Sequence, residues 1–192
     1  FNIIELKNKK NLFFDRLKEL TNYHDGPIAT LSYYIHSFLS ENISKKDIKV
    51  SISGTGADEI FTGYYDHFLQ HLSSVHGTNR YDKDLKSWEK FILPLVRNPS
   101  LKNPLLYIND KKNRDNVYEK NFKILNFSKK NFASEFKENN YCEELLRKRM
   151  LNELFSEIVP VILKHDDLNS MYYSVENRSP YLDRNLLEFS LT

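Results

Sequence analysis

The chain has 192 residues, of which 40% are hydrophobic, so it is long enough for one α/β domain or for part of a larger one. Its 28 basic and 26 acidic residues leave a net charge of +2, which argues against a dedicated nucleic-acid-binding protein. The single cysteine, Cys142, excludes an intramolecular disulfide framework and a cysteine-based zinc site. No apolar run approaches the roughly 20 residues of a membrane span, and no signal peptide opens the chain. We therefore expect a cytoplasmic protein without a membrane partner, and the absence of an initial Met suggests a fragment.

The first third of the chain alternates predicted strands and helices. Residues 1–6 form a short apolar run that predicts a strand, and apolar residues at helical spacing predict a helix over 11–21. After a polar loop, apolar residues spaced three and four positions apart predict an amphipathic helix, with the stripe Leu31, Tyr34, Ile35, Phe38 and Leu39. A second strand is predicted over 48–53, where β-branched and polar residues alternate. This order is typical of a parallel sheet, in which ligands bind at the carboxyl ends of the strands.

A glycine turn follows the strand at 48–53. The chain has only five glycines, and three of them (Gly54, Gly56 and Gly63) fall within ten residues. Glycine permits a positive φ and close backbone approach, and a turn that opens a helix presents free N–H groups to an anion. Asp58 or Glu59 could hold a cation that bridges phosphate oxygens. The alternative is a tight turn whose two acidic residues only complement the helix dipole.

The rest of the chain is predicted to be helical. One helix covers about 58–72, and another, over 85–95, is interrupted by Pro94. Residues 97–137 contain ten basic and four acidic residues, which indicates a solvated surface or, alternatively, a contact surface for an anionic partner. A clear helix over 142–159 ends or kinks at Pro160.

The last part of the chain contains a second informative stretch. A helix is predicted from the apolar face formed by Leu168, Met171, Tyr172 and Val175, with a shaped turn at Ser179-Pro180 and a final helix beyond it. We divide the chain into a nucleotide-binding α/β part (1–72), a Lys- and Asn-rich insertion or helical segment (73–141) and a C-terminal helical part (142–192).

Two stretches together resemble a known family. Residues 53–64 (S-G-T-G-A-D-E-I-F-T-G-Y) resemble the S-G-x-G-x-D-E-x-F-x-G-Y signature of the synthetase domain of glutamine-hydrolysing asparagine synthetases. Residues 167–183 are similar to the later block of that family, D-R-x-S-M-x-x-S-x-E-x-R-x-P-F-L-D, and residues 24–27 resemble its D-E-P or D-G-P loop. The similarity covers most of 1–72 and 142–191.

The resemblance implies an α/β fold: a partial parallel sheet flanked by helices, of the adenine-nucleotide α-hydrolase type, with an additional helical part. It also implies an ATP-dependent carbon–nitrogen ligase with Mg²⁺ as cofactor. A substrate carboxylate attacks the α-phosphorus of ATP, pyrophosphate leaves, and ammonia from a glutaminase domain attacks the resulting acyl-adenylate. By the same resemblance, the protein takes part in asparagine biosynthesis and forms a homodimer.

The resemblance also assigns site residues. The catalytic residues are Thr55 and Asp58, with Asp58 the Mg²⁺ ligand; ATP is contacted by Ser53, Gly54 and Gly56; and the substrate is faced by His165, Asp167 and Ser170. Glu176 and Arg178 are expected to form a structural pair that shapes the following turn.

Departures from the family pattern leave the substrate open. The pyrophosphate loop S-G-G-x-D-S does not occur in the 192 residues, so we expect no activity from this polypeptide alone. Thr55 stands where the family usually has Asp or Glu, and a neutral hydroxyl is not a general base at neutral pH. Leu168 replaces a usual Arg or Lys. The acceptor is therefore aspartate or, alternatively, a sugar acid or another carboxylate. A non-catalytic module that has kept the synthetase fold is the competing hypothesis.

Overall fold

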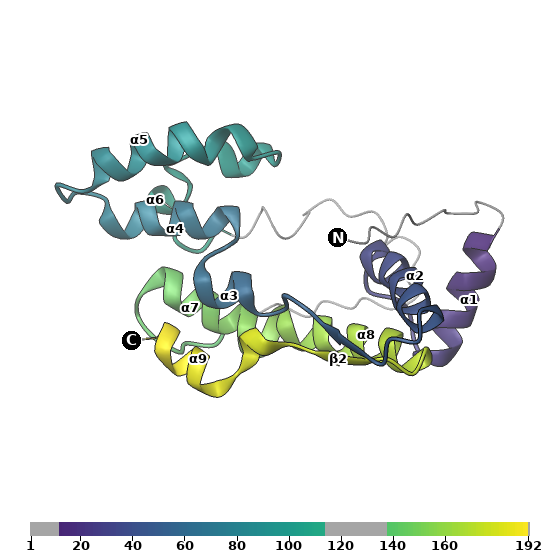
Figure 1. The fold of residues 1–192 in the computed structure, drawn as a ribbon. Helices are drawn as coiled ribbons and strands as arrows, with labels where there is room; N and C mark the ends of the chain where they lie inside the picture. The colour runs from purple at the N-terminus through teal and green to yellow at the C-terminus, as the bar shows by residue number, and fades with distance from the viewer. Residues whose placement is uncertain (1–11, 114–137, 192) are drawn as a thin grey trace. The chain divides into compact units, whose positions relative to one another are not determined.

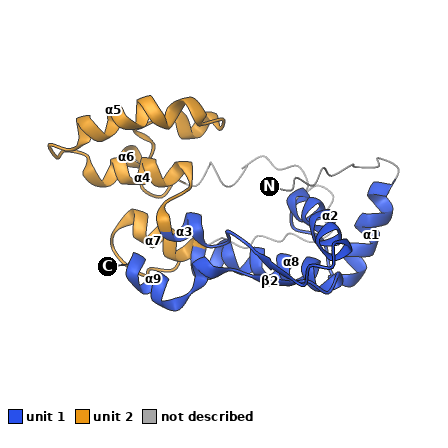
Figure 2. Cartoon of the chain, in the orientation of Figure 1, with its two compact units in different colours: residues 1–60, 154–192 blue, residues 61–153 orange. Residues whose placement is uncertain are grey.

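The computed structural model describes residues 12–113 and 138–191. The chain divides into two compact units: unit 1 comprises residues 1–60 and 154–192, and unit 2 comprises residues 61–153 (Figure 2). The strand predicted at 1–6 and residues 114–137 of the Lys-rich stretch lie outside the described residues. The three-segment division of the sequence stays a prediction.

Unit 1 holds a small parallel sheet and its flanking helices (Figure 1). Its elements are, in chain order, α1 (Phe13–Tyr23), α2 (Leu31–Lys45), β1 (Val50–Ile52), α3 (Ala57–Phe61, whose last residue belongs to unit 2), α8 (Val159–Tyr172), β2 (Glu176–Arg178), η6 (Pro180–Leu182) and α9 (Arg184–Ser190).

The two strands of unit 1 run parallel, with Val50 opposite Glu176 and Ile52 opposite Arg178. The sequence predicts β1 but not β2, because the three residues of β2 show no alternation of β-branched and polar residues. It predicts only the turn that follows β2. Helices around a parallel sheet confirm the α/β fold class, although most described residues are helical. In a parallel pair both carboxyl ends lie at the same edge, so the segments that follow β1 and β2 start side by side.

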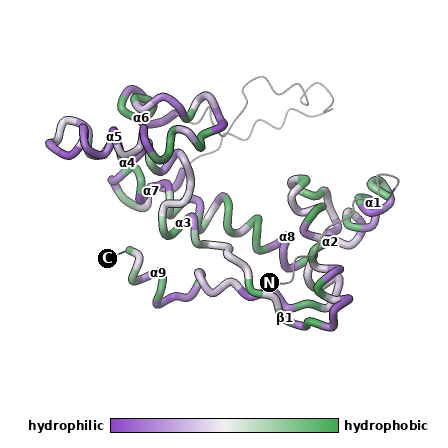
Figure 3. The backbone as a smooth tube through the Cα atoms, turned by 45° about the horizontal axis from the view of Figure 1, so that its top comes forward, coloured by the Kyte–Doolittle hydropathy of each residue, from purple (hydrophilic) through white to green (hydrophobic). Residues whose placement is uncertain are grey.

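Helices α2 and α8 pack against each other in unit 1, and hydrophobic and hydrophilic stretches alternate along both of them (Figure 3). The buried amide of Asn169 on α8 donates a hydrogen bond of 2.9 Å to the carbonyl oxygen of Tyr33 on α2. The imidazole of His165 stacks on the Tyr33 ring at 4.4 Å between centroids. Because α8 leads into β2, this packing fixes the second strand relative to the rest of unit 1.

Every regular element that the structure describes in unit 2 is a helix. Its elements are α4 (Tyr65–Val75), α5 (Tyr81–Phe91), η2 (Leu93–Leu95), η3 (Pro99–Lys102), α6 (Leu106–Asn109), α7 (Leu145–Asn152) and the start of the π-helical turn η5 (Glu153–Glu157). Their apolar faces enclose one core, formed by Leu69, Leu72, Trp88, Val96, Leu101 and Tyr107. In the ranges that the structure covers, no helix has both the length and the apolar character needed to cross a bilayer.

Two predicted helices differ from those observed. The helix expected over 58–72 is divided into α3 and α4, because Thr62 adopts a left-handed φ of 58° that no α-helix accommodates. Pro160 lies in the first turn of α8, where a backbone N–H would have no hydrogen-bond partner within the helix. It therefore begins a helix instead of ending the preceding one, which has already changed to a π-helical turn at Glu153.

Candidate functional site

The two family-like stretches meet at the carboxyl edge of the sheet in unit 1. Ser53 directly follows β1, and Ser179 directly follows β2. The backbone N–H of Ser53 donates to the carbonyl oxygen of Arg178 at 2.8 Å, and the Oγ atoms of Ser53 and Ser179 lie 3.0 Å apart. Residues 126 positions apart therefore share one polar edge, where ligands of parallel α/β sheets bind.

Gly56 lies directly against the later stretch. Its φ of +95° is in the left-handed region, and a Cβ atom at this position would lie 2.4 Å from Leu182 Cδ2 and 3.6 Å from Tyr181 Cβ. Only glycine avoids both the steric conflict and the backbone strain. The close packing of Leu182 against the turn therefore explains why residue 56 is a glycine.

The turn at 53–56 leads directly into α3. The N–H of Ala57 donates to the carbonyl oxygen of Gly54 at 3.1 Å, and the hydroxyl of Ser53 donates to Thr55 Oγ1 at 3.1 Å. A Cβ atom at Gly54 would meet nothing within 4 Å. One side of the turn is therefore open for a ligand to approach the backbone, and the other side is filled by Leu182.

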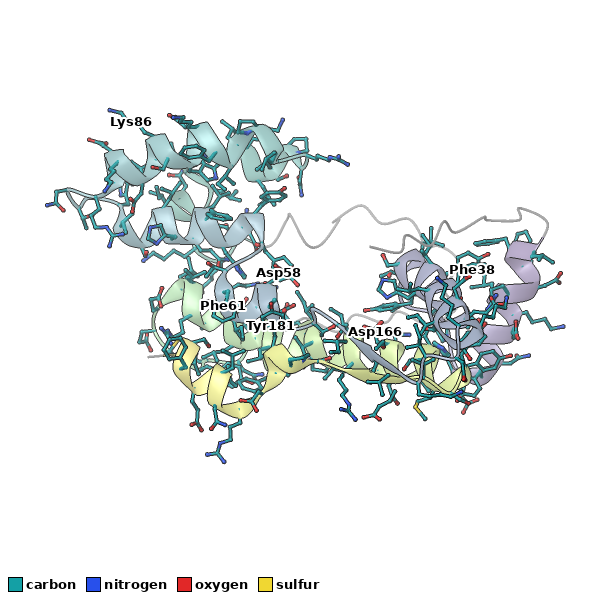
Figure 4. All side chains as sticks on the ribbon, in the orientation of Figure 1. Phe38, Asp58, Phe61, Lys86, Asp166 and Tyr181 are labelled. Carbon is teal, nitrogen blue, oxygen red and sulfur yellow. The ribbon has the colours of Figure 1, made fainter. Side chains whose placement is uncertain are left out.

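The acidic pair at the start of α3 has two different environments. Asp58 is exposed, and no residue that the structure describes forms an ion pair or hydrogen bond with its carboxylate (Figure 4). Glu59 is only 2% exposed. Exposed carboxylate oxygens are the ligands that Mg²⁺ prefers, whereas a buried carboxylate is held by its protein neighbours. Asp58 is thus the member of the pair that is available to a cation.

The site residues predicted on α8 are placed differently from those on the turn. Asp167 is exposed, whereas Ser170 is buried and its hydroxyl donates to the carbonyl oxygen of Asp167 at 3.1 Å. His165 is buried against Tyr33, and burial lowers the pKa of its imidazole. Among the described residues, no hydrogen bond joins these three side chains to the turn at 53–58. The five predicted residues of the turn lie together because they are neighbours in the sequence, and the roles assigned to them and to the α8 residues stay predictions.

The later stretch also carries structural residues. The guanidinium of Arg178 donates from Nε to Glu176 Oε1 at 2.9 Å, which confirms the expected pair. The carboxylate of Asp183 accepts hydrogen bonds from the N–H groups of Asn185 and Leu186, so it caps the N-terminus of α9. These contacts hold the segment after β2 in place beside the turn.

Sequence reasoning missed Ser179 as a member of the polar edge. The sequence predicts Ser179 only as part of a turn, although it follows β2 just as Ser53 follows β1. That equivalence is the signal that could have identified it, but reading it requires the parallel register of β1 and β2.

Comparison with known proteins gives one match. A family model described as asparagine synthase matches residues 2–192. Searches of curated proteins and of solved structures return no match. The match spans nearly the whole chain, including both stretches that meet at the sheet edge. The chain therefore belongs to the asparagine synthase family, whose synthetase modules are ATP-dependent amide-forming ligases.

Proposed function

We propose that this chain is the part of a glutamine-hydrolysing, cytoplasmic ligase that activates a carboxylate with ATP before amide formation. The observation that carries the proposal is the meeting of the turn after β1 with the turn after β2, marked by the 3.0 Å contact between Ser53 and Ser179. A glycine turn that opens a helix, at the carboxyl edge of a parallel sheet, offers N–H groups and hydroxyls to a phosphate.

The residues of the turn fit a magnesium–nucleotide complex. The open side of Gly54 admits a phosphate close to the backbone, and the hydroxyls of Ser53 and Thr55 offer hydrogen bonds there. Asp58, exposed and without a protein partner among the described residues, would hold Mg²⁺. A magnesium ion at this position would neutralise the charge that gathers on the departing pyrophosphate.

The proposed reaction has two steps. A carboxylate oxygen of the acceptor attacks the α-phosphorus of ATP, and the bond to pyrophosphate breaks. Ammonia from a glutaminase domain then attacks the acyl carbon of the adenylate, AMP leaves, and the nitrogen loses a proton to solvent. Thr55 is neutral at physiological pH, so we assign it hydrogen bonding at the turn and no proton abstraction.

The acceptor is an acid that contacts α8. Asp167 is the exposed carboxylate of the three residues predicted to face the substrate, so a direct contact is assigned to it. His165 and Ser170 are buried and act by holding α8 in place. Aspartate fits the family, whereas a sugar acid is favoured by the neutral Thr55 and by Leu168, which stand where the family usually has charged side chains.

The test is release of pyrophosphate from Mg-ATP by the complete protein, screened against aspartate, glutamate and sugar carboxylates. Asp58→Asn should lower carboxylate-dependent release by about 100-fold or more, because it removes the metal ligand. Asp82→Asn is the matched control, since Asp82 is also an exposed acidic residue in the first turn of a helix. This control should retain full activity.

The outcomes separate the hypotheses. Release that depends on one carboxylate and is lost only in the Asp58 variant would support the ligase and identify its acceptor. If no carboxylate stimulates release and calorimetry detects no ATP binding, the proposal fails, and the chain is a synthetase-like module without catalysis. A homodimer, expected from the family, would be measured in the same preparation by light scattering.

A further inference from the structure

Unit 2 contains a buried cluster of groups that can bind a metal ion. Asp66 and His67 lie in the first turn of α4, and Glu153 lies at the end of α7. Their exposed fractions are 8%, 1% and 1%, and one ligand atom of each residue lies within 4.8 Å of the other two. The His67 Nε2 atom is 2.7 Å from Glu153 Oε2. None of these residues belongs to the turn at 53–58.

Among the described residues, carboxylates outnumber the guanidinium at this cluster. Arg149 is buried beside it, with its Nε 2.8 Å from Glu153 Oε1 and its NH1 group 3.4 Å from Glu138 Oε1. One guanidinium therefore serves two carboxylates. The Asp66 carboxylate forms no hydrogen bond or ion pair with any described residue, although it is more than nine-tenths buried. A largely buried carboxylate without a cationic partner is costly, so a positive charge beside Asp66 would stabilise the cluster.

We propose that Asp66, His67 and Glu153 bind one divalent transition-metal ion, of which zinc is the first candidate. An imidazole nitrogen and two carboxylate oxygens are the donor set that suits Zn²⁺ and its neighbours, whereas Mg²⁺ and Ca²⁺ are bound through oxygen alone. The ion supplies the positive charge that the Asp66 carboxylate lacks. Its fourth position would be filled by water, since three protein ligands are present.

The geometry needs only small adjustments to accept the ion. Ligand atoms bound about 2.1 Å from a tetrahedral zinc lie about 3.4 Å from one another. The His67–Glu153 hydrogen bond would open slightly, and the Asp66 carboxylate would move closer. Metal ligands bind in their deprotonated form, so zinc would replace the hydrogen bond between His67 Nε2 and Glu153 Oε2, and its proton would leave to solvent.

Such an ion would be structural. It would connect the start of α4 to Glu153, 86 positions later in the chain, and both lie within unit 2. An ion that binds the folded state and not the unfolded chain stabilises the fold by mass action. We therefore expect metal removal to lower the melting temperature of the protein while leaving its secondary structure formed at room temperature.

The test uses the full chain, stripped with EDTA, dialysed and titrated with Zn²⁺. We expect one zinc per chain by elemental analysis after further dialysis, and a melting temperature at least about 5 °C above that of the stripped protein. Asp66→Asn should weaken zinc binding by about 100-fold or more. The control is His71→Gln, because His71 lies on the same helix and pairs with Asp84 at 3.0 Å outside the cluster. This variant should bind zinc like the wild type.

Three results would overturn the proposal. The first is a reloaded wild type that retains no zinc after dialysis and melts at the same temperature as the stripped protein, because the cluster then needs no metal ion. The second is an Asp66 variant that binds zinc as tightly as the wild type, which would place the ion elsewhere. If Asp66→Asn does not fold, zinc-edge X-ray absorption of the wild type decides: the proposal requires imidazole and oxygen ligands, and a spectrum without imidazole scattering contradicts it.

Discussion

Asp58 and Asp66 lie eight positions apart in the sequence and have opposite environments. Asp58 is exposed at the start of α3, beside an open glycine turn in unit 1. Asp66 is buried at the start of α4, beside His67 and Glu153 in unit 2. An exposed carboxylate can exchange water for a substrate-bound cation, whereas a buried one must have a permanent partner. The first environment fits the proposed magnesium–nucleotide site, and the second fits the proposed structural metal ion.

Each of the two regions is stabilised by a different kind of interaction. The turn of unit 1 depends on close apolar packing, since Gly56 leaves no room for a Cβ atom beside Leu182. The cluster of unit 2 depends on charge, because Arg149, His67 and Glu153 form a buried network. Substitutions in the first region should therefore act through packing and ligand binding, and substitutions in the second through the loss of buried charge pairs.

The largest expected effect on stability comes from breaking the buried network. Glu153→Gln, measured in EDTA, should lower the free energy of unfolding by about 3 kcal/mol or more, since it removes the buried carboxylate that lies 2.8 Å from Arg149 Nε. Glu188→Gln removes the partner of an exposed ion pair with Arg184 and should cost about 0.5 kcal/mol or less. Equal losses in urea denaturation would contradict the contrast between buried and exposed pairs.

Alanine substitutions at the two glycines of the turn should differ in effect: one should lower the stability of the fold, and the other should weaken ligand binding. Gly56→Ala forces a Cβ atom against Leu182 at a left-handed φ, so we expect a loss of about 2–3 kcal/mol in the free energy of unfolding. Gly54→Ala meets no neighbouring atom and should unfold like the wild type. The same Gly54 variant should bind Mg-ATP more weakly, because its methyl group occupies the open side of the turn. Unchanged ATP affinity in Gly54→Ala would argue against a phosphate at this position.

The packing of α8 in unit 1 should depend on pH. Burial lowers the pKa values of His24 and His165, whose ring centroids lie 5.5 Å apart. The unfolded chain therefore binds more protons below pH 6.5, so their contribution is complete above that pH and falls on acidification. His36 has the opposite sign: its hydrogen bond to Asp166 raises its pKa, so its contribution is complete below pH 6.5 and is lost as pH rises through the raised value.

Urea midpoints at pH 5.5 and pH 8 would test these signs. His165→Phe keeps the stacking on Tyr33 but cannot be protonated, so its midpoint should fall less on acidification than that of the wild type. His36→Gln loses the group that opposes the fall, so its midpoint should decrease more steeply. A wild type and a His165 variant with identical pH dependence would show that the buried imidazole does not contribute.

The smallest effect should come from the hydroxyl contact that joins the two turns. Ser179→Ala removes the partner of Ser53 Oγ and should lower the free energy of unfolding by about 0.5–1 kcal/mol. Ser74→Ala is the control, since its exposed hydroxyl donates only to a carbonyl of its own helix. Because Ser179 lies on the polar edge, its variant should also reduce carboxylate-dependent pyrophosphate release, and the Ser74 variant should not.

Local patterns predicted much of unit 1. The strand β1 and the helix α2 follow from alternation and from the apolar stripe beginning at Leu31, because these signals lie within a few residues of each other. The break between α3 and α4 was not predicted, since Thr62 is not a residue type expected at a positive φ. A short helix divided at one unusual residue looks continuous when only the spacing of its apolar residues is considered.

Contacts between distant segments could not be predicted in the same way. The Gly56–Leu182 contact and the Ser53–Ser179 pair depend on the parallel register of β1 and β2, which three residues per strand do not encode by periodicity. The group of Asp66, His67 and Glu153 has no recognisable spacing, since its last member lies 86 positions from His67. The resemblance identified the two stretches that contain the polar edge, and the parallel register of the strands shows why Ser179 of the later stretch lies beside Ser53.

The most direct test of the account is hydrogen–deuterium exchange of the complete protein with and without Mg-ATP. We predict slower exchange in two sets of peptides, one covering the turn at 53–58 and one covering 177–183. Peptides from α4 and α5, over 65–91, serve as the internal reference and should exchange at the same rate in both conditions. Protection of both turns together would support a shared nucleotide site at the sheet edge. Protection of only one turn, or protection elsewhere while both turns stay unchanged, would contradict it.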